Sequence, residues 1–277
     1  MVVARRSAIL NVMADAAEKA GRALVRDFGE VEHLQVSQKG PADFVSTADH
    51  KAEKIVMETL AKARPSYGFL MEEGGAKKGK ESNVRWIIDP LDGTTNFLHG
   101  IPHWAVSIAL EKDNEIIAGV VHNPINDETF YAEKGMGAFM TGRRLRVSNR
   151  TDLMQCVIAM GGARPGTKSH TVFMTEQDAV SPYCAGMRRF GAASLDICYV
   201  AAARVDGFWE RDLSAWDVAA AALILKESGG TVTDLNGGKD YVYGRSIVVG
   251  NSTVHGQLLK KIKAVSGKEA PKVKSAT

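Results

Sequence analysis

The sequence predicts a protein of mixed α and β structure, with an α+β first half and an α/β second half. Near the N-terminus, two amphipathic helical patterns precede a series of short β-rich runs separated by turn residues. From about Asp152 onward, short apolar runs alternate with helical patterns instead. The chain has 277 residues, of which 45% are hydrophobic, so it is long enough and apolar enough to bury a large core.

Two helices are predicted in the first half. Apolar residues recur every three or four positions up to Phe28, so the first helix is expected to end near Gly29. The second is expected to begin at an N-cap formed by Ser46 or Thr47 and to end at Pro65, because proline interrupts helical hydrogen bonding. Between them the sequence predicts a short strand and then a loop, at residues 31–36 and 39–49.

The rest of the first half is predicted to form an antiparallel sheet. Val84–Ile88 is a short apolar run typical of a buried strand, and a turn is expected directly after it. A hairpin is expected at residues 112–115. The other predicted strands are 67–71, 104–111, 116–122, 129–132 and 137–140.

The second half alternates between the two kinds of element. Its predicted strands are 157–160, 187–190, 207–210, 231–234 and 247–250. Its predicted helices are 171–180, 192–203, 215–227 and 254–265. We expect one catalytic domain over residues 1–265, in which residues 1–150 carry most metal ligands and residues 151–265 complete the site. Residues 266–277 are polar and basic without apolar period, and we expect a disordered tail there.

Composition argues against several classes of protein. The net charge of +3 favours neither nucleic acid nor a membrane surface as a partner. The three cysteines are far apart and without the spacing of a zinc site, which fits a reducing compartment. No signal peptide and no apolar run of membrane-spanning length are recognised, so we expect a cytoplasmic protein.

The chain is organised around one stretch, Asp-Pro-Leu-Asp-Gly-Thr-Thr-Asn-Phe at residues 89–97. It follows the apolar run Val84–Ile88, and Pro90 and Gly93 are turn-forming residues. A strand that ends in two acids and a turn brings carboxylates and free peptide N–H groups to one place. This combination suits a divalent cation and a phosphate group, although an isolated stretch of this kind is more often a surface turn.

Further acids stand at the ends of other predicted elements: Asp49, Glu72 with Glu73, and Asp217. Each has an ordinary structural explanation. Asp49 could offset the helix dipole, Glu72 could be a solvated strand end, and Asp217 could complete a capping box with Ser214. Their coincidence with the 89–97 stretch is what favours a functional site.

The sequence resembles the inositol monophosphatase family over nearly its whole length. The matching pieces are Lys39–Asp49, Glu72-Glu73, Asp89–Phe97, His99–Pro102, Gly191–Ala193, Glu210, Trp216–Ala220 and Glu227–Gly230. Within the family, the segment from Trp209 to Asp217 is similar to bacterial inositol-1-monophosphatases of the extragenic suppressor SuhB type. The resemblance implies a layered α/β/α/β/α sandwich of the sugar-phosphatase type, a homodimer, and a lithium-sensitive phosphatase.

The resemblance also implies roles for individual residues. The first Mg²⁺ is expected at Glu72, Asp89 and the Leu91 carbonyl, and a second at Asp89, Asp92 and Asp217, with two or three ions per site. Thr94, held by Asp49 and assisted by Glu72, is expected to orient or deprotonate the attacking water. The remaining implied contacts are to substrate: the amides of Gly93 and Thr94 to phosphate, and Ala193 and Glu210 to the hydroxyls of a phosphorylated polyol.

The sequence leaves three alternatives open. The substrate could instead be 3′-phosphoadenosine 5′-phosphate, histidinol phosphate or fructose 1,6-bisphosphate, and the loop at residues 161–168 departs from the family pattern. SuhB-like relatives suggest an association with RNA polymerase, for which the Arg143-Arg144 and Arg188-Arg189 pairs are candidate contacts. The acids could also bind Ca²⁺ without turnover.

Overall fold

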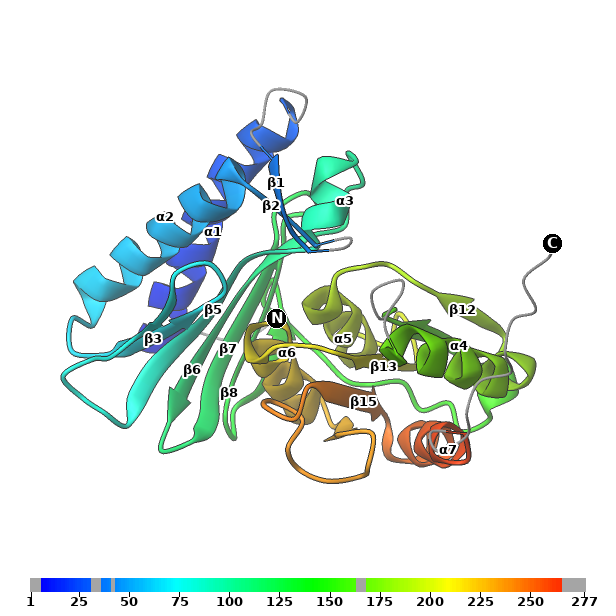
Figure 1. Ribbon diagram of the computed structural model, residues 1–277. Helices are drawn as coiled ribbons and strands as arrows, with labels where there is room; N and C mark the ends of the chain where they lie inside the picture. Colours follow the sequence, from blue (N-terminus) through cyan, green and yellow to red (C-terminus); the bar gives the residue numbers. More distant parts are fainter. Residues whose placement is uncertain (1–5, 31–35, 41–42, 163–167, 266–277) are drawn as a thin grey trace.

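Helices and sheets alternate in five layers across the molecule (Figure 1). The computed structural model describes residues 6–30, 36–40, 43–162 and 168–265. From one side to the other, the layers are α1 with α2, an eight-stranded sheet, α5 with α6, a five-stranded sheet, and α4 with α7. This is the layered α/β/α/β/α arrangement that the resemblance implied. The predicted tail at 266–277 lies outside the described residues.

The helices are α1 Ala8–Phe28, α2 Thr47–Ala63, α3 Thr94–Leu98, α4 Lys168–Val180, α5 Ala193–Ala201, α6 Ala215–Glu227 and α7 Ser252–Lys263. The strands of the first half are β1 Val36–Gly40, β2 Asp43–Ser46, β3 Gly68–Met71, β4 Gly75–Lys77, β5 Val84–Asp92, β6 Ala105–Lys112, β7 Glu115–Asn123, β8 Glu128–Glu133, β9 Gly137–Met140 and β10 Arg143–Arg144. Those of the second half are β11 Val157–Met160, β12 Gly186–Arg188, β13 Gly207–Arg211, β14 Thr231–Thr233 and β15 Ser246–Gly250.

Local capping fixes where α1 and α2 begin. The Ser7 side chain accepts a hydrogen bond from the Leu10 amide, and α1 ends at Phe28 as its apolar period predicted. Ser46 is the N-cap of α2 and forms a reciprocal capping box with Asp49. The stretch before it was predicted to be a loop, but its described parts form strands β1 and β2, which pair antiparallel.

The eight-stranded sheet has the order β10-β9-β8-β7-β6-β5-β3-β4. It is antiparallel as predicted, with one exception: β3 and β5 run parallel, with Met71 opposite Ile88. The prediction was wrong at this pair because β4 folds back on β3 as a hairpin, and the chain then returns to begin β5 on the other side of β3. This parallel pair brings the carboxyl ends of two strands to the same edge.

Strand β5 also extends further than predicted. It continues through Pro90 to Asp92, and the turn comes only at Gly93, whose φ of 93° favours glycine. Between Asp89 and Asp92 the strand advances by three residues while β6 advances by two, from Ser107 to Ala105. This bulge accommodates Pro90, which has no N–H to give to the ladder.

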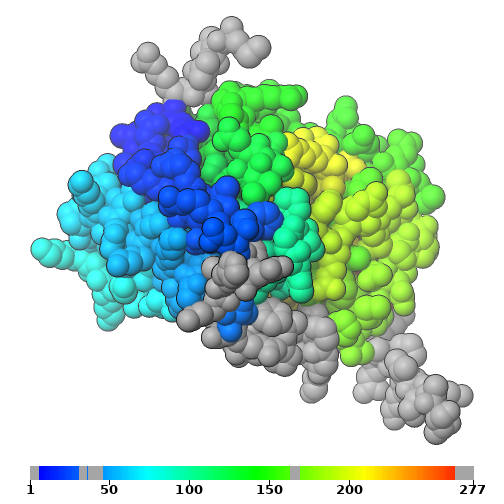
Figure 2. Space-filling model, turned by 90° about the horizontal axis from the view of Figure 1, so that it is seen from above, coloured from blue at the N-terminus to red at the C-terminus, as the bar shows by residue number. Residues whose placement is uncertain are grey.

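The two halves share one apolar core. Helix α6 packs on strands of the eight-stranded sheet and on β14 of the five-stranded sheet, which has the order β12-β11-β13-β15-β14. The largest cluster of buried residues accordingly includes Ile87 from the first half and Phe208 from the second. Seen from above, the segment around α3 lies between the blue and cyan first half and the yellow-green second half (Figure 2). No helix within the described residues combines the length and the apolar character needed to cross a membrane.

At Gly119 the sheet lies close against the backbone of α6, and substitution of this glycine should reveal how tightly the two pack. A Cβ at this position would lie 2.7 Å from the Ala220 carbonyl oxygen and 2.9 Å from its Cα. Since backbone cannot yield easily, we expect Gly119→Ala to lower the free energy of unfolding by about 1–3 kcal/mol.

Gly256, inside α7, is the matched control for this measurement. Nothing lies within 4 Å of a Cβ added there, so Gly256→Ala should raise stability by up to about 1 kcal/mol. Chemical denaturation of both variants checks the pair. Equal effects would show that the contact between β7 and α6 is looser than described.

Candidate active site

Four acids from three elements meet at one edge of the large sheet. Asp89 and Asp92 lie in the last four residues of strand β5, and both are buried. Glu72 follows β3, and its amide donates to the Ile88 carbonyl at 3.2 Å, which places it beside Asp89. Asp217 lies in the first turn of α6. The predicted metal ligands are therefore brought together, and the parallel pairing of β3 with β5 is what places Glu72 among them.

Three of these acids are held by peptide N–H groups. An oxygen of Asp89 accepts from the Leu91 amide at 2.9 Å, Asp92 from the Ser194 amide at 2.7 Å, and Asp217 from the Ser214 amide at 2.6 Å. The last bond is part of the capping box of α6 that the sequence suggested. Each of these three carboxyl groups is thus fixed through one of its oxygens by a backbone amide.

Burial and mutual repulsion raise the pKa values of these groups. The pKa of Asp89 lies well above its usual value because of burial and then the charges of Glu72, Asp92 and Asp217. Burial, followed by the charge of Asp92, raises the pKa of Asp217 to about 8. A side-chain hydrogen bond with Glu72 also raises the pKa of Asp89, whereas one from Asp89 lowers that of Asp217.

The donor set has the chemistry of a site for a hard divalent cation. It consists of carboxylate oxygens, which Mg²⁺ prefers, and their repulsion would be relieved by positive charge. In the part of the chain that the structure describes, no three His, Cys, Asp or Glu side chains are already positioned to hold a metal ion. The residues present fit the ion chemically.

Thr94 and Asp49 form the second part of the site. The Thr94 hydroxyl lies 3.1 Å from Asp49 Oδ1 and 3.0 Å from the Leu91 carbonyl oxygen. Asp49 Oδ2 accepts from the Ser46 amide at 2.9 Å and from its hydroxyl at 2.7 Å. Burial raises the pKa of Asp49, against these hydrogen bonds. The pair expected from the sequence is thus in contact, with Asp49 fixed by the cap of α2.

A cavity of about 510 Å³ opens beside the acids. Of the predicted site residues, its walls contain Asp92, Ala193, Glu210 and Asp217. The others do not line it: Asp49, Glu72, Asp89, Leu91, Gly93 and Thr94. Asn96 joins the walls from the two halves, since its side-chain amide donates to the carbonyls of His103 and Phe190, each at 2.7 Å.

Glu210 faces the acids from β13. Burial raises its pKa well above the usual value, and the charges of Asp196, Asp217 and Asp92 act in the same direction. A Cβ added to Gly161 would lie 1.7 Å from the Glu210 Cδ, so the carboxyl group rests directly on the Gly161 backbone. Arg189, which also lines the cavity, opposes this pKa shift.

Several residues of the site were not found from the sequence. Ser194 contacts Asp92, His103 Nε2 lies 3.2 Å from Asp196 Oδ1, and Gly161 supports Glu210. Only Ser194 had a signal, because it directly follows the Gly191–Ala193 match. The sequence treated 161–168 as a loop departing from the family pattern. Gly161 and Gly162 line the cavity, whereas residues 163–167 lie outside the described residues.

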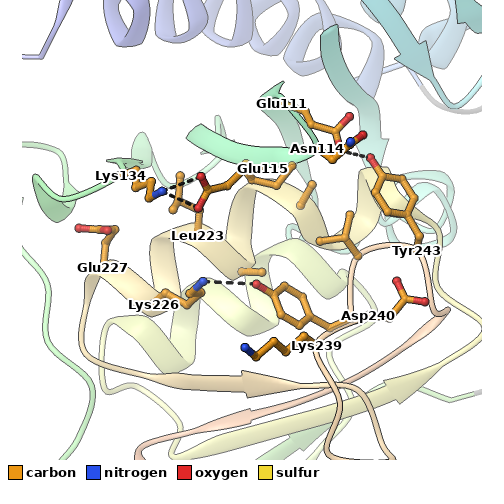
Figure 3. Close-up of a pocket in the computed structure, with 15 residues that line it drawn as sticks. Glu111, Asn114, Glu115, Lys134, Leu223, Lys226, Glu227, Lys239, Asp240 and Tyr243 are labelled. Carbon is orange, nitrogen blue, oxygen red and sulfur yellow. Dashed lines mark hydrogen bonds and ion pairs between the residues drawn. The ribbon is translucent and has the colours of Figure 1, made fainter. Parts of the chain in front are cut away.

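A second cavity, of about 400 Å³, lies at the other end of α6 (Figure 3). Three of its four acids already have partners: Glu115 pairs with Lys134, Glu111 accepts from Tyr243, and Glu227 accepts from the amides of Gly135 and Gly137. The clustered acids with strongly raised pKa values lie at the first cavity instead. The first cavity is therefore the candidate active site.

Comparison with known proteins places this geometry in a family. The sequence profile of the inositol monophosphatase family matches residues 5–266. The chain belongs to the inositol monophosphatase family. The prediction from the sequence is confirmed, and with it the prediction of an enzyme of a phosphatase family.

Individual relatives support the assignment. The chain is 57% identical over 258 residues to an inositol-1-monophosphatase of Mesorhizobium japonicum, covering 93% of this chain and 97% of that one. It is 40% identical over 246 residues to the Nus factor SuhB of Escherichia coli, covering 89% and 92%. Among solved structures, the extragenic suppressor protein SuhB of Bartonella henselae superposes with a TM-score of 0.90 at 56% identity, covering 93% and 99%.

The raised pKa values predict how stability depends on pH in the absence of metal. Asp217 has a folded-state pKa of about 8, far above its ordinary value, so the folded state binds this proton more tightly than the unfolded state. Its stabilising contribution is complete at low pH and is lost as pH rises through about 8. Burial lowers the pKa of His103 below its usual value of 6.5, so this histidine changes the free energy of unfolding only below about pH 6.5. The contribution of Asp217 is therefore examined above that pH.

We therefore expect the melting temperature of the metal-free chain to fall between about pH 6.5 and pH 8. Saturating Mg²⁺ should remove most of that slope, because the cation replaces the proton. Asp217→Asn, which cannot ionise, should make the metal-free slope shallower, while Asp89 and Glu210, whose pKa values are also raised, keep part of it. Calorimetry of both chains at several pH values provides the measurement, and a slope unchanged by this substitution would contradict the assignment.

Proposed function

We propose that the chain is a Mg²⁺-dependent phosphomonoesterase that hydrolyses myo-inositol monophosphate to inositol and phosphate. The observation that carries this proposal is the meeting of four acids with the Thr94–Asp49 pair beside a cavity that contains Glu210. The names of the relatives in Mesorhizobium japonicum and Caulobacter vibrioides, both inositol-1-monophosphatases, support the substrate.

The acids divide between two proposed ions. Glu72, Asp89 and the Leu91 carbonyl would hold the first, and Asp89, Asp92 and Asp217 the second. At about 4 Å and an effective dielectric constant near 20, two carboxylates repel by about 4 kcal/mol, which a cation between them offsets. Bound there, Mg²⁺ would lower the pKa of the attacking water and offset negative charge on phosphate and leaving oxygen. Occupation of the second position by Li⁺ is part of the same proposal.

Thr94 and Asp49 would move the proton of the attacking water. The Thr94 hydroxyl has one proton and two acceptors, Asp49 Oδ1 and the Leu91 carbonyl oxygen. If the Leu91 carbonyl oxygen binds the first ion, it no longer accepts the hydroxyl proton of Thr94, and Asp49 Oδ1 is the remaining acceptor. The water then gives a proton to Thr94 Oγ1 as its oxygen attacks phosphorus, and Thr94 passes its own to Asp49, with Glu72 assisting nearby. The bond from phosphorus to the inositol oxygen breaks, that oxygen takes up a proton from solvent water, and Asp49 returns its proton to solvent, so the net reaction consumes one water.

The substrate would be bound from both sides of the cavity. The amides of Gly93 and Thr94 would hold phosphate oxygens, where the αL conformation of Gly93 turns the chain into α3. Ala193 and Glu210 would face the polyol. A carboxylate repels phosphate but accepts hydrogen bonds from hydroxyl groups, so Glu210 is suited to the leaving group rather than to the reacting one.

We also propose a cytoplasmic homodimer, and a second function for the same chain. Five relatives bear the name Nus factor SuhB, which favours an association with RNA polymerase through a surface outside the cavity. Co-purification with RNA polymerase tests this association. It is independent of phosphate release, so either function can stand without the other.

Phosphate release is the direct test of the main proposal. Chelation should abolish release from inositol 1-phosphate and Mg²⁺ should restore it. Asp92→Asn should lose most turnover, because it removes one charge from the second position. A panel of phosphomonoesters, including 3′-phosphoadenosine 5′-phosphate and histidinol phosphate, identifies the preferred substrate through kcat/KM. Undiminished release in excess chelator would sink the metal-dependent mechanism.

Removal of the Thr94 hydroxyl should slow the chemical step. We expect Thr94→Ala to lower kcat by roughly 10²–10⁴, the usual contribution of one proton-transfer group, with little change in KM. Thr94→Ser keeps the hydroxyl and should retain most activity. A large rise in KM with kcat intact would make Thr94 a binding residue instead.

Glu210 should determine selectivity between substrates. Glu210→Gln should reduce kcat/KM for inositol 1-phosphate by about tenfold, equivalent to about 1.4 kcal/mol. Release from a small phosphate ester without hydroxyl groups should hardly change. Gly161→Ala should have the same selective effect, because its Cβ displaces the Glu210 carboxyl group. Equal losses on both substrates would show that Glu210 supports the metal site or the fold.

A further inference from the structure

The hydroxyl group of Ser194 contacts an acid of the site from the layer behind it. Ser194 is fully buried in the first turn of α5. Its hydroxyl donates to Asp92 Oδ2 at 2.5 Å, and its amide donates to the same oxygen at 2.7 Å. Both donors come from one residue of the second half, whereas Asp92 belongs to β5 of the first half.

We propose that Ser194 is a positioning residue for the second metal site. With two donors on Oδ2, the carboxyl plane of Asp92 is fixed from behind, and Oδ1 is assigned to the cation. This inference rests on the proposed function, since it takes Asp92 as a metal ligand. It adds a residue to which neither the sequence motifs nor the resemblance gave any task.

The surroundings of Asp92 show why a second donor matters. Asp92 is buried, and the hydrogen bonds from Ser194 oppose the effect of burial on its pKa, which is nevertheless raised. Asp196, two residues further along α5, has a pKa raised well above its usual value by burial and then by the Asp92 charge. The donors of Ser194 therefore stabilise Asp92 in its charged form, which is the form that binds a cation.

The position of Ser194 also links metal and substrate. Ala193, which lines the cavity and is proposed to face the polyol, is its immediate neighbour in α5. A shift of this turn changes the substrate wall and the orientation of Asp92 together. The hydroxyl of Ser194 ties the two halves at this point, beside the bonds that Asn96 makes to Phe190 and His103.

The amide bond survives in Ser194→Ala, so this variant removes the hydroxyl bond alone. Metal binding is measured directly on the metal-free full-length chain, with Mn²⁺ as the probe and free Mn²⁺ read by electron paramagnetic resonance. We expect the weaker of two dissociation constants to rise about tenfold, the lower end of the effect of removing a partner of a metal ligand. The Mg²⁺ concentration for half-maximal phosphate release should rise by a similar factor, with kcat at saturating Mg²⁺ near its original value.

Ser228→Ala is the matched control. Ser228 is a buried serine whose hydroxyl donates to the Leu225 carbonyl at 2.7 Å, at the far end of α6. Its loss should lower the melting temperature but leave both Mn²⁺ constants unchanged. Ser194→Cys, of similar size with a weaker donor, should fall between the original chain and Ser194→Ala.

The outcomes separate the inference from the function on which it rests. Mn²⁺ constants in Ser194→Ala equal to those of the unmodified chain, with that chain binding two ions, would overturn the positioning role and leave the phosphatase proposal standing. An equal loss of Mn²⁺ binding in Ser228→Ala would also overturn the positioning role, because the loss would then follow from removing any buried serine hydroxyl. Absence of Mn²⁺ binding in the unmodified chain would reject the metal-dependent function itself.

Discussion

The repulsion among four carboxyl groups is the constraint on which the rest of this structure depends. Asp89 and Asp92 are buried, and the charges of neighbouring acids raise the pKa values of Asp89 and Asp217. Such a cluster persists because the backbone holds it: amides of Leu91, Ser194 and Ser214 each bond one acid. The Leu91 amide belongs to the bulge of β5, and the amides of Ser194 and Ser214 lie at the N-termini of α5 and α6. The packing of these elements in the layered core keeps the amides in place.

The two halves of the molecule divide the site between them. The large sheet supplies Asp89, Asp92 and Glu72, while α5, β13 and α6 supply Ser194, Glu210 and Asp217. The apolar cluster that runs through both halves is therefore what sets the distances between the acids. The close approach of β7 to α6 at Gly119 belongs to this core, although it lies away from the acids in the chain. Packing and chemistry are connected through α6.

Local signals in the sequence predicted what local interactions determine. The apolar period located α1, and the serine caps of α2 and α6 were read correctly because capping involves residues three apart. The parallel pairing of β3 with β5, the extension of β5 through Pro90, and the β1–β2 pair were missed. Register between strands depends on long-range contacts, which no short window contains. The same holds for Ser194 and Gly161, whose partners lie far away in the chain.

The capping boxes of α2 and α6 give Asp49 and Asp217 a role in folding that is separate from any role in the site. Asp49 and Asp217 close the first turns of their helices, so a relative that had lost catalysis would still be selected to retain both for folding. Glu72 does not cap a helix, and its replacement would relieve repulsion in a chain that no longer binds cations. Within a family whose members bear the names of both inositol-1-monophosphatases and Nus factors, Glu72 is thus an acid whose retention helix capping does not explain.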